Sequence, residues 1–347
     1  MKAYKKFISF PKIKDYKTAV QNITHAARYE GFDEEKQEVI YNTDPLPTIT
    51  FTGTVKLHGT NAGVCYNNQE GFWYQSRENI ITPQKDNAGF AFFADTNKDV
   101  FKAIIEQIAI DNNISLDEFT VSVYGEWAGG SIQKGVALNE LEKQFYIFGV
   151  KISKPQDPEF TSYWVDSTKY ASKENKIFNV DQFTTYTMEI DFNQHKEIVN
   201  DLITITEAVE AECPTCKAFG VSGVGEGVVW RAEYKGIVYR FKVKGAKHSN
   251  NKVKKLVEVD PVKLASVNEF VDYTVTENRV DQGIQIIFGD GFIEKKKTGD
   301  FLKWIVNDII EEEGHTLAEN GLEPKDVTKS LSNKARIMLF KRYEDQW

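Results

Sequence analysis

The sequence predicts an α+β fold, in which a body of strands with a few helices is followed by an all-helical region. Short runs of β-branched and aromatic residues alternate with Gly-containing turns up to about residue 255. Beyond that point, apolar residues recur every three or four positions. The 347 residues, 41% of them hydrophobic, are enough for about two packed domains. We therefore expect domains at residues 1–255 and 256–347.

Composition excludes several classes of protein. No run of about 18 apolar residues is present to span a bilayer, and the opening MKAYKKFISF lacks the apolar core of a secretory signal. Three cysteines cannot form a complete set of disulfides, which is typical of a reducing compartment. We expect a cytoplasmic protein with no membrane partner.

The apolar spacing of amphipathic helices occurs in both regions. The predicted helices are 96–111 and 193–212 in the body, and 268–288, 300–313 and a stretch beginning near Pro324 in the tail. Glu277 interrupts the apolar stripe of the first tail helix. A proline is common at the first helical position, so Pro324 marks a helix start.

The predicted strand 49–56 (ITFTGTVK) ends in a lysine on its polar face. Alternation directs Ile49, Phe51 and Val55 to one side and Lys56 to the other. A short polar turn, LHGTN at 57–61, follows at once. Gly59 in this turn would let a ligand approach the backbone closely.

The predicted strand 237–244 (IVYRFKVK) places three cations on one face. Ile237, Tyr239, Phe241 and Val243 are expected to face a core, and Arg240, Lys242 and Lys244 the opposite side. These cations repel one another unless an anion lies between them, and a polyphosphate is a natural anion. A solvated edge strand that carries charges against aggregation is the alternative.

Charge is unevenly distributed along the chain. The net charge is −8, which by itself disfavours a nucleic-acid partner. However, residues 240–255, the basic ribbon, hold seven Lys or Arg and no Asp or Glu. An acidic exterior with one basic channel would confine nucleic-acid binding to that channel.

Two glutamates and two cysteines also stand out. Glu126 closes the strand-like FTVSVYGE, and Glu226 opens EGVVWR after a Gly-rich segment. Cys213 and Cys216 form a CxxC, a spacing found in half of a zinc site or in a redox pair. Because no matching second pair of ligands is evident, we interpret them as free thiols at a helix end.

Taken in order, the motifs resemble the nucleotidyltransferase superfamily of ATP-dependent ligases and capping enzymes. The amino-acid sequences of these motifs are most similar to those of the bacteriophage-type RNA ligase 2 family. They are KLHGTN at 56, YGEWAG at 124 followed by IQKGV, FYIFGV at 145, EGVVWR at 226 and FKVK at 241. The opening YKKFISFPKI and the helical tail are similar to that family as well. The resemblance implies an adenylation domain of antiparallel sheets with flanking helices, and a C-terminal helical domain that binds nucleic-acid ends.

The resemblance also implies the catalytic roles. Lys56 would attack the α-phosphate of ATP and become the covalent lysyl-AMP, for which it must be a neutral amine. Lys242 and Lys244 would hold the AMP phosphate, and their charges would disfavour a third cation nearby. Glu226 would bind Mg²⁺ or Mn²⁺, since such ions prefer oxygen ligands.

Further residues are implied to bind the nucleotide or the nucleic acid. Phe148 would stack on adenine, Arg77 and Glu126 would hold the ribose and help to dock the ends, and Leu57 lies beside the nucleophile in the ATP site. Contacts with phosphate or with the nucleic acid are expected for His58, Asn61, Arg240 and Lys247.

The implied enzyme is an ATP-dependent RNA ligase with a role in RNA repair. Its co-substrate would be ATP, and its partner would be RNA with 3′-hydroxyl and 5′-phosphate ends in a duplex or bridged nick. We expect a monomer, either cellular or encoded by a virus. The alternatives are a DNA ligase or capping guanylyltransferase of the same superfamily, and a catalytically inactive nucleic-acid-binding module.

The sequence departs from its relatives at several positions. DNA ligases and capping enzymes carry Lys-x-Asp-Gly-x-Arg and a following OB-fold, whereas this chain has His58 and Asn61 at those two positions and a helical tail. Both differences favour RNA sealing. Val55 and Arg231 replace an acidic residue and a lysine expected from the phage enzyme.

Overall fold

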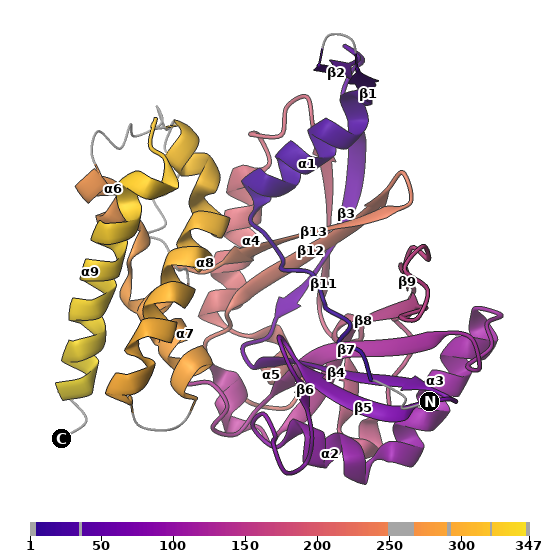
Figure 1. The fold of residues 1–347 in the computed structure, drawn as a ribbon. Coiled ribbons are helices and arrows are strands. Elements are labelled where there is room, and N and C mark those ends of the chain that lie inside the picture. Colours follow the sequence, from indigo (N-terminus) through magenta and orange to yellow (C-terminus); the bar gives the residue numbers. More distant parts are fainter. Residues whose placement is uncertain (1–4, 35–36, 249–266, 290–292, 320, 345–347) are drawn as a thin grey trace. The chain divides into compact units, whose positions relative to one another are not determined.

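The chain forms two compact units, each with its own hydrophobic core. The computed structural model describes residues 5–34, 37–248, 267–289, 293–319 and 321–344. The first unit comprises residues 1–198 and 202–243, and the second comprises 199–201 and 244–347. The expected boundary between residues 255 and 256 lies outside the described residues, so it stays a prediction. The α+β fold class with a helical C-terminal region is confirmed (Figure 1).

The larger sheet of the first unit has the strand order β10-β8-β7-β4-β5-β6, and β9 pairs with β8 beside this path. Its strands are β4 (Thr60–Asn67), β5 (Gly71–Ser76), β6 (Ile80–Ile81), β7 (Thr120–Ala128), β8 (Gln144–Ser153), β9 (Tyr163–Val165) and β10 (Ile177–Asn179). The pairs are antiparallel except for β10 with β8, which is parallel. The sheet is therefore mixed, although antiparallel pairing dominates.

Helices α2 (Phe90–Thr96) and α3 (Lys98–Asp111) cover one face of this sheet (Figure 1). Phe101 and Ile105 of α3 are completely buried in a core that they share with β7 and β8. The helix expected at 96–111 is thus confirmed except at its start. Asn97 separates the two helices and has a non-helical backbone conformation.

The smaller sheet of the first unit has the order β11-β3-β12-β13. Its strands are β3 (Thr48–Lys56), β11 (Thr185–Asp191), β12 (Gly227–Tyr234) and β13 (Ile237–Lys244). Helices α1 (Tyr16–Arg28) and α4 (Val199–Ala211) pack on one face, and the short α5 is Pro214–Lys217. Helix α4 begins six residues later than the predicted start at 193, since residues 193–198 form turns.

The core of the smaller sheet confirms most of the predicted alternation. Phe51 and Phe241 are fully buried with ring centroids 5.2 Å apart, and Trp230 stacks on Phe241 at 6.2 Å. Ile237, which was expected to face the core, is instead 54% exposed. It is the first residue of β13, an edge strand, directly after the turn from β12.

A two-stranded hairpin of β1 (Tyr29–Asp33) and β2 (Glu38–Tyr41) follows α1 directly. It projects from the end of α1 in Figure 1, and its large apolar side chains are exposed. The exposed side chains are Tyr29, Phe32, Val39, Ile40 and Tyr41. Four 3₁₀ helices are also described, at Ala137–Glu140, Lys173–Asn175, Val180–Gln182 and Lys295–Lys297.

The second unit is helical. It contains α6 (Val267–Thr274), α7 (Glu277–Phe288), α8 (Thr298–Glu319) and α9 (Pro324–Glu344). Helix α8 is longer than the predicted 300–313, and α9 starts at Pro324 as expected. The prediction of one helix at 268–288 is wrong, because α6 ends at Thr274 and a new helix, α7, begins at Glu277. Thr276 caps α7 by accepting a hydrogen bond from the backbone N–H of Arg279 (3.3 Å).

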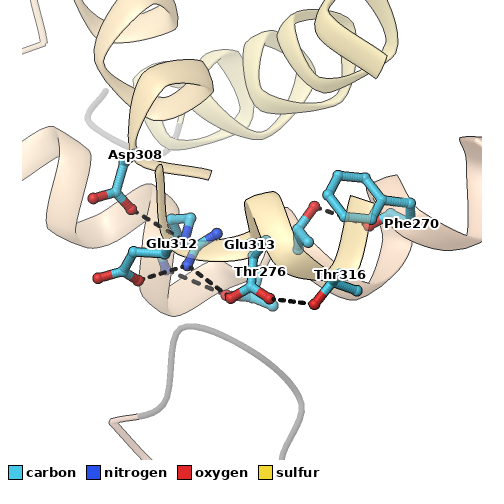
Figure 2. Close-up of polar contacts among 8 residues, drawn as sticks. Phe270, Thr276, Asp308, Glu312, Glu313 and Thr316 are labelled. Carbon is cyan, nitrogen blue, oxygen red and sulfur yellow. Dashed lines mark hydrogen bonds and ion pairs between the residues drawn. The ribbon is translucent and has the colours of Figure 1, made fainter. Parts of the chain in front are cut away.

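A completely buried arginine, Arg279, joins α7 to α8. Figure 2 labels its carboxylate partners, Asp308, Glu312 and Glu313. The Arg279 guanidinium lies 3.0 Å from Glu312 Oε2, 3.4 Å from Asp308 Oδ2 and 3.9 Å from Glu313 Oε1. Thr316 donates a 3.3 Å hydrogen bond to Glu313 Oε2. We call Arg279, Asp308, Glu312 and Glu313 the buried ionic cluster. Because the cluster is buried, the packing of α7 against α8 depends on the positive charge of Arg279.

Within the described part of the chain, no helix is both long enough and apolar enough to cross a membrane.

Candidate active site

Lys56 and Glu226 meet at one end of the smaller sheet. Lys56 is the last residue of β3, and the antiparallel register places it opposite Gly227, the first residue of β12. Glu226 precedes Gly227, so its side chain reaches Lys56, and the Nζ–Oε2 distance is 2.6 Å. Glu226 is 2% exposed. The predicted nucleophile and the predicted metal ligand are thus in direct contact.

His58 reaches the same carboxylate. Its Nδ1 lies 3.2 Å from Glu226 Oε2, so this oxygen contacts both the Lys56 amine and the His58 ring. Leu57, between them in sequence, points into the core of the smaller sheet and is 5% exposed. The side chain of Leu57 therefore packs under the site, and its predicted ATP contact stays a prediction.

Glu126 supports the turn that follows Lys56. Its Oε1 accepts a 2.9 Å hydrogen bond from the backbone N–H of Gly59, and its register partner in β4 is Asn61. The expectation that Glu126 ends a strand is wrong, because β7 continues to Ala128. Desolvation raises the pKa of Glu126 and Glu226 acts in the same direction, although Lys56, the Gly59 N–H and His58 lower it.

This raised pKa predicts a pH-dependent stability difference between the parent and Glu126→Gln. A carboxyl group with a higher pKa in the folded state stabilises the fold below its unfolded pKa, and this contribution is lost as pH rises through the folded value. Glutamine still accepts the Gly59 N–H but does not ionise. In urea unfolding from about pH 4 to about pH 8, the parent should lose stability relative to the variant as pH rises. A relative gain by the parent would contradict this assignment.

Gly59 lies too close to β7 for any side chain. A Cβ at Gly59 would be 2.3 Å from the Trp127 carbonyl oxygen and 2.6 Å from the Ala128 Cβ. To accommodate a side chain, the backbone of the turn would have to move away from β7. Gly59 does not have a positive φ, so the close approach to β7, and not a left-handed conformation, explains the glycine. The glycine thus holds residues 57–61 against β7, next to Glu126.

Gly59→Ala should destabilise the fold by about 1–3 kcal/mol, because overpacking displaces the turn. It should also slow nucleotide transfer to Lys56, three residues away. Thermal unfolding and labelling with radioactive ATP would measure the two effects. Gly314→Ala is the matched control, because a Cβ there meets no atom within 4 Å. Equal behaviour of the two variants would show that the close approach at Gly59 is unimportant.

A basic face lies on the side of the smaller sheet opposite Phe241. Because Phe241 packs in the core, its neighbours Arg240 and Lys242 point to the other side of β13. Lys235 and Gly236 both have positive φ (50° and 73°) in the two-residue turn between β12 and β13. The end of β13 that carries Lys242 and Lys244 therefore lies at the same end of the sheet as Gly227 and Lys56.

Two arginines on this face have different environments. Arg231 Nη2 lies 2.5 Å from Asp181 Oδ1, an ion pair that the sequence did not reveal. Arg240 instead contacts aromatic rings, with its Cζ 4.4 Å from the Trp164 centroid. Burial lowers the pKa of Arg240 to about 10, and the charge of Arg231 adds to this effect.

Three other predicted residues lie on or next to strands β8, β5 and β13. Phe148 is a half-buried residue of β8 that packs against the core of the smaller sheet. Arg77 is exposed just after β5 and has no hydrogen-bond or ion-pair partner among the residues described. Lys247 follows β13, and its carbonyl oxygen accepts a 2.9 Å hydrogen bond from Asn278. The part of the basic ribbon at 249–255 lies outside the described residues.

Two contacts that shape the turn after Lys56 were not predicted from the sequence. Gln133 donates a 3.4 Å hydrogen bond to the Gly59 carbonyl oxygen, and Asn87 donates one of 2.9 Å to Thr60 Oγ1. Gln133 belongs to the IQKGV motif, which was a usable signal. Asn87 lies in a loop of ordinary polar composition, and only the tertiary structure brings it to the turn.

Cys213 and Cys216 are buried free thiols, at the N-cap of α5 and within α5. The Cys216 thiol lowers the pKa of Cys213 to about 7 by hydrogen bonding, and the same contact raises the pKa of Cys216. Cys213 N–H also donates to the Gly223 carbonyl (2.8 Å), in the segment that leads to Glu226. No group of three or more His, Cys, Asp or Glu with metal-binding geometry occurs among the described residues.

Comparisons with known proteins identify a family. Residues 49–244 match the family model described as RNA ligase. No curated protein sequence matches the chain.

Similar solved structures include Naegleria gruberi RNA ligase with PPi, at 17% identity and a TM-score of 0.43. Variants of that enzyme with AMP and Mn (18%, 0.41) and with ATP and Mn (17%, 0.41) are also similar. Each match covers 70% of this chain and 58% of the other. The family model spans more than half of the sequence and includes Lys56, Glu126, Glu226 and Lys242. The chain belongs to the RNA ligase family.

Proposed function

We propose that the protein is an ATP-dependent RNA ligase that joins a 3′-hydroxyl end to a 5′-phosphate end, as in the repair of nicked RNA. The observation that carries the proposal is the 2.6 Å contact between Lys56 and buried Glu226, within the segment that matches the family. The basic face beside this pair supports it, because such a face suits a polyphosphate.

In the first step, the Lys56 amine attacks the α-phosphorus of ATP. A P–N bond forms, the bond to the bridging oxygen breaks and pyrophosphate leaves. The amine must first lose a proton, and Glu226 at 2.6 Å is the nearest acceptor that the structure describes. Lys242 and Lys244 would neutralise the charge that develops on the phosphate oxygens.

Two further displacements complete the reaction. An oxygen of the 5′-phosphate attacks the lysyl-AMP phosphorus, which breaks the P–N bond and leaves an A(5′)pp(5′)N end. The 3′-hydroxyl then attacks the terminal phosphorus of the RNA, the phosphodiester forms and AMP leaves. Phe148 would hold the adenine and Arg77 the ribose, while His58, Asn61 and Arg240 would contact phosphates.

Glu226 suits a divalent cation such as Mg²⁺ or Mn²⁺. Mg²⁺ is commonly held by one or two carboxylates together with substrate phosphates, and Glu226 is a buried carboxylate beside the proposed phosphate site. A bound ion would neutralise phosphate charge. Lys56 and His58, which now share the Glu226 oxygen, would then be free to turn toward the nucleotide.

Incubation with ATP or GTP labelled at the α-phosphate tests the first step. We expect label on the denatured protein from ATP and not from GTP. Label from GTP alone would overturn the ligase proposal in favour of a capping guanylyltransferase, and no label from either would favour an inactive binding module.

Nicked duplexes with RNA or DNA on either side of the nick test the substrate. We expect sealing when the 3′-hydroxyl strand is RNA. Sealing restricted to all-DNA nicks would contradict the assignment and favour a DNA ligase.

A further inference from the structure

The N-terminal segment 7–14, which we call the strap, is hydrogen-bonded to both sheets of the first unit. At one end, the Ile8 N–H donates to Gln75 Oε1 (3.2 Å), and Gln75 Nε2 and the Tyr124 hydroxyl both donate to the Ile8 carbonyl. At the other end, the Lys242 N–H donates to the Lys14 carbonyl (2.9 Å). The strap therefore connects the larger sheet to the strand that carries Lys242.

Phe10, midway along the strap, packs against rings from three strands of the larger sheet. Its centroid lies 4.9 Å from Phe148, 5.2 Å from Trp164 and 5.3 Å from Tyr124. The Phe148 contact is edge-to-face at an interplanar angle of 60°. Such contacts fix the tilt of a ring as well as its position.

Phe10 also meets the basic face. Arg240 Cζ lies 5.4 Å from the Phe10 centroid and 4.4 Å from that of Trp164, so the guanidinium is held by both rings. Arg240 has no hydrogen-bonded carboxylate among the described residues, and cation–π contacts are its observed interactions. One side chain thus touches both the proposed adenine platform and the basic strand.

We infer that Phe10 is a positioning residue for ATP binding, because it orients Phe148 and holds β13 at the distance that suits adenine and phosphate together. The inference rests on the proposed function. Phe148 is half-buried and its ring packs edge-to-face with Phe10, so its orientation depends on this neighbour. The strap sets the spacing between the two halves of the nucleotide site before ATP arrives, which preorganises it.

The inference predicts a selective effect on adenine binding. Sealing an RNA end that already carries AMP needs no free ATP, but the adenine of that end would rest on the same Phe148 ring. Phe10→Leu should weaken direct ATP binding about tenfold, which matches the strength of one or two aromatic contacts. For the pre-adenylylated end, the loss should appear as a higher KM, with kcat within about twofold of the parent value. Phe10→Tyr, which retains the ring, should behave like the parent.

The experiment measures ATP binding by calorimetry, the KM for ATP in protein labelling, and sealing of the pre-adenylylated end. Phe160→Leu is the matched control, because Phe160 makes an edge-to-face pair with Phe119 (5.6 Å) outside the site. ATP affinity within about twofold of the parent in Phe10→Leu would overturn the inference, and so would a loss in sealing that lowers kcat without raising KM. If Phe10→Leu does not fold, equal ATP affinities of Phe10→Tyr and Phe10→Met would also overturn it. Calorimetry does not depend on ligation, so failure of the proposed function is recognised separately, by the absence of labelling in the parent.

Discussion

Lys56→Arg should abolish nucleotide transfer to the protein, lowering it by more than about 1,000-fold. Arginine keeps the positive charge and its attraction to Glu226, so the electrostatics of the pair should survive. A guanidinium is not deprotonated in proteins and cannot act as the amine nucleophile. Protein labelling from ATP and overall joining of 5′-phosphate ends measure the loss.

Lys102→Arg is the matched control. Lys102 also makes a 2.6 Å ion pair with a glutamate, Glu106, but on the surface of α3. This variant should label at the parental rate. The third step forms no bond to Lys56, so Lys56→Arg should still seal a pre-adenylylated end. Residual labelling of Lys56→Arg above a few percent of the parent would show that another residue is the nucleophile.

Arg279→Met should destabilise the second unit by about 3–5 kcal/mol, the typical cost of removing one partner of a buried ion pair. Methionine fills much of the same volume, so the loss would come from charge. Asp308, Glu312 and Glu313 would keep their negative charges without the guanidinium between them. Denaturant unfolding followed by helical circular dichroism measures the change.

Arg342→Met provides the comparison within the same unit. Arg342 of α9 pairs with Glu277 (2.6 Å) and Asp281 (3.0 Å) of α7, but its partners are exposed. Exposed pairs contribute about 0–1 kcal/mol, so this variant should be nearly as stable as the parent. Similar losses in both variants would mean that burial of the Arg279 cluster does not control its contribution.

Local periodicity was sufficient to predict the central parts of the site. The alternation in 49–56 and 237–244 separates core side chains from Lys56, Arg240 and Lys242, and the structure confirms this separation at Phe51 and Phe241. Alternation depends only on backbone geometry, so it survives without knowledge of the partner strands. The motif order correctly predicted an RNA ligase, whereas the bacteriophage RNA ligase 2 type and the roles of all the candidate site residues remain predictions.

Longer-range contacts could not be read from the sequence. The ion pair of Arg231 with Asp181 and the contact of Phe10 with Phe148 join residues that are 50 and 138 positions apart. Nothing in local composition selects those partners. The break before α7 is different, because Thr276 followed by Glu277 is an ordinary helix-capping signal that the apolar stripe obscured.

The β1–β2 hairpin has a consequence for the behaviour of the protein at high concentration. Two short strands with exposed apolar side chains offer open edges to other chains, which favours self-association. Glu30, Asp33 and Glu38 lie on the same two strands and give them like charges. Colloidal stability of the protein should therefore depend on these carboxylates, and replacing them with amides should promote precipitation through the hairpin.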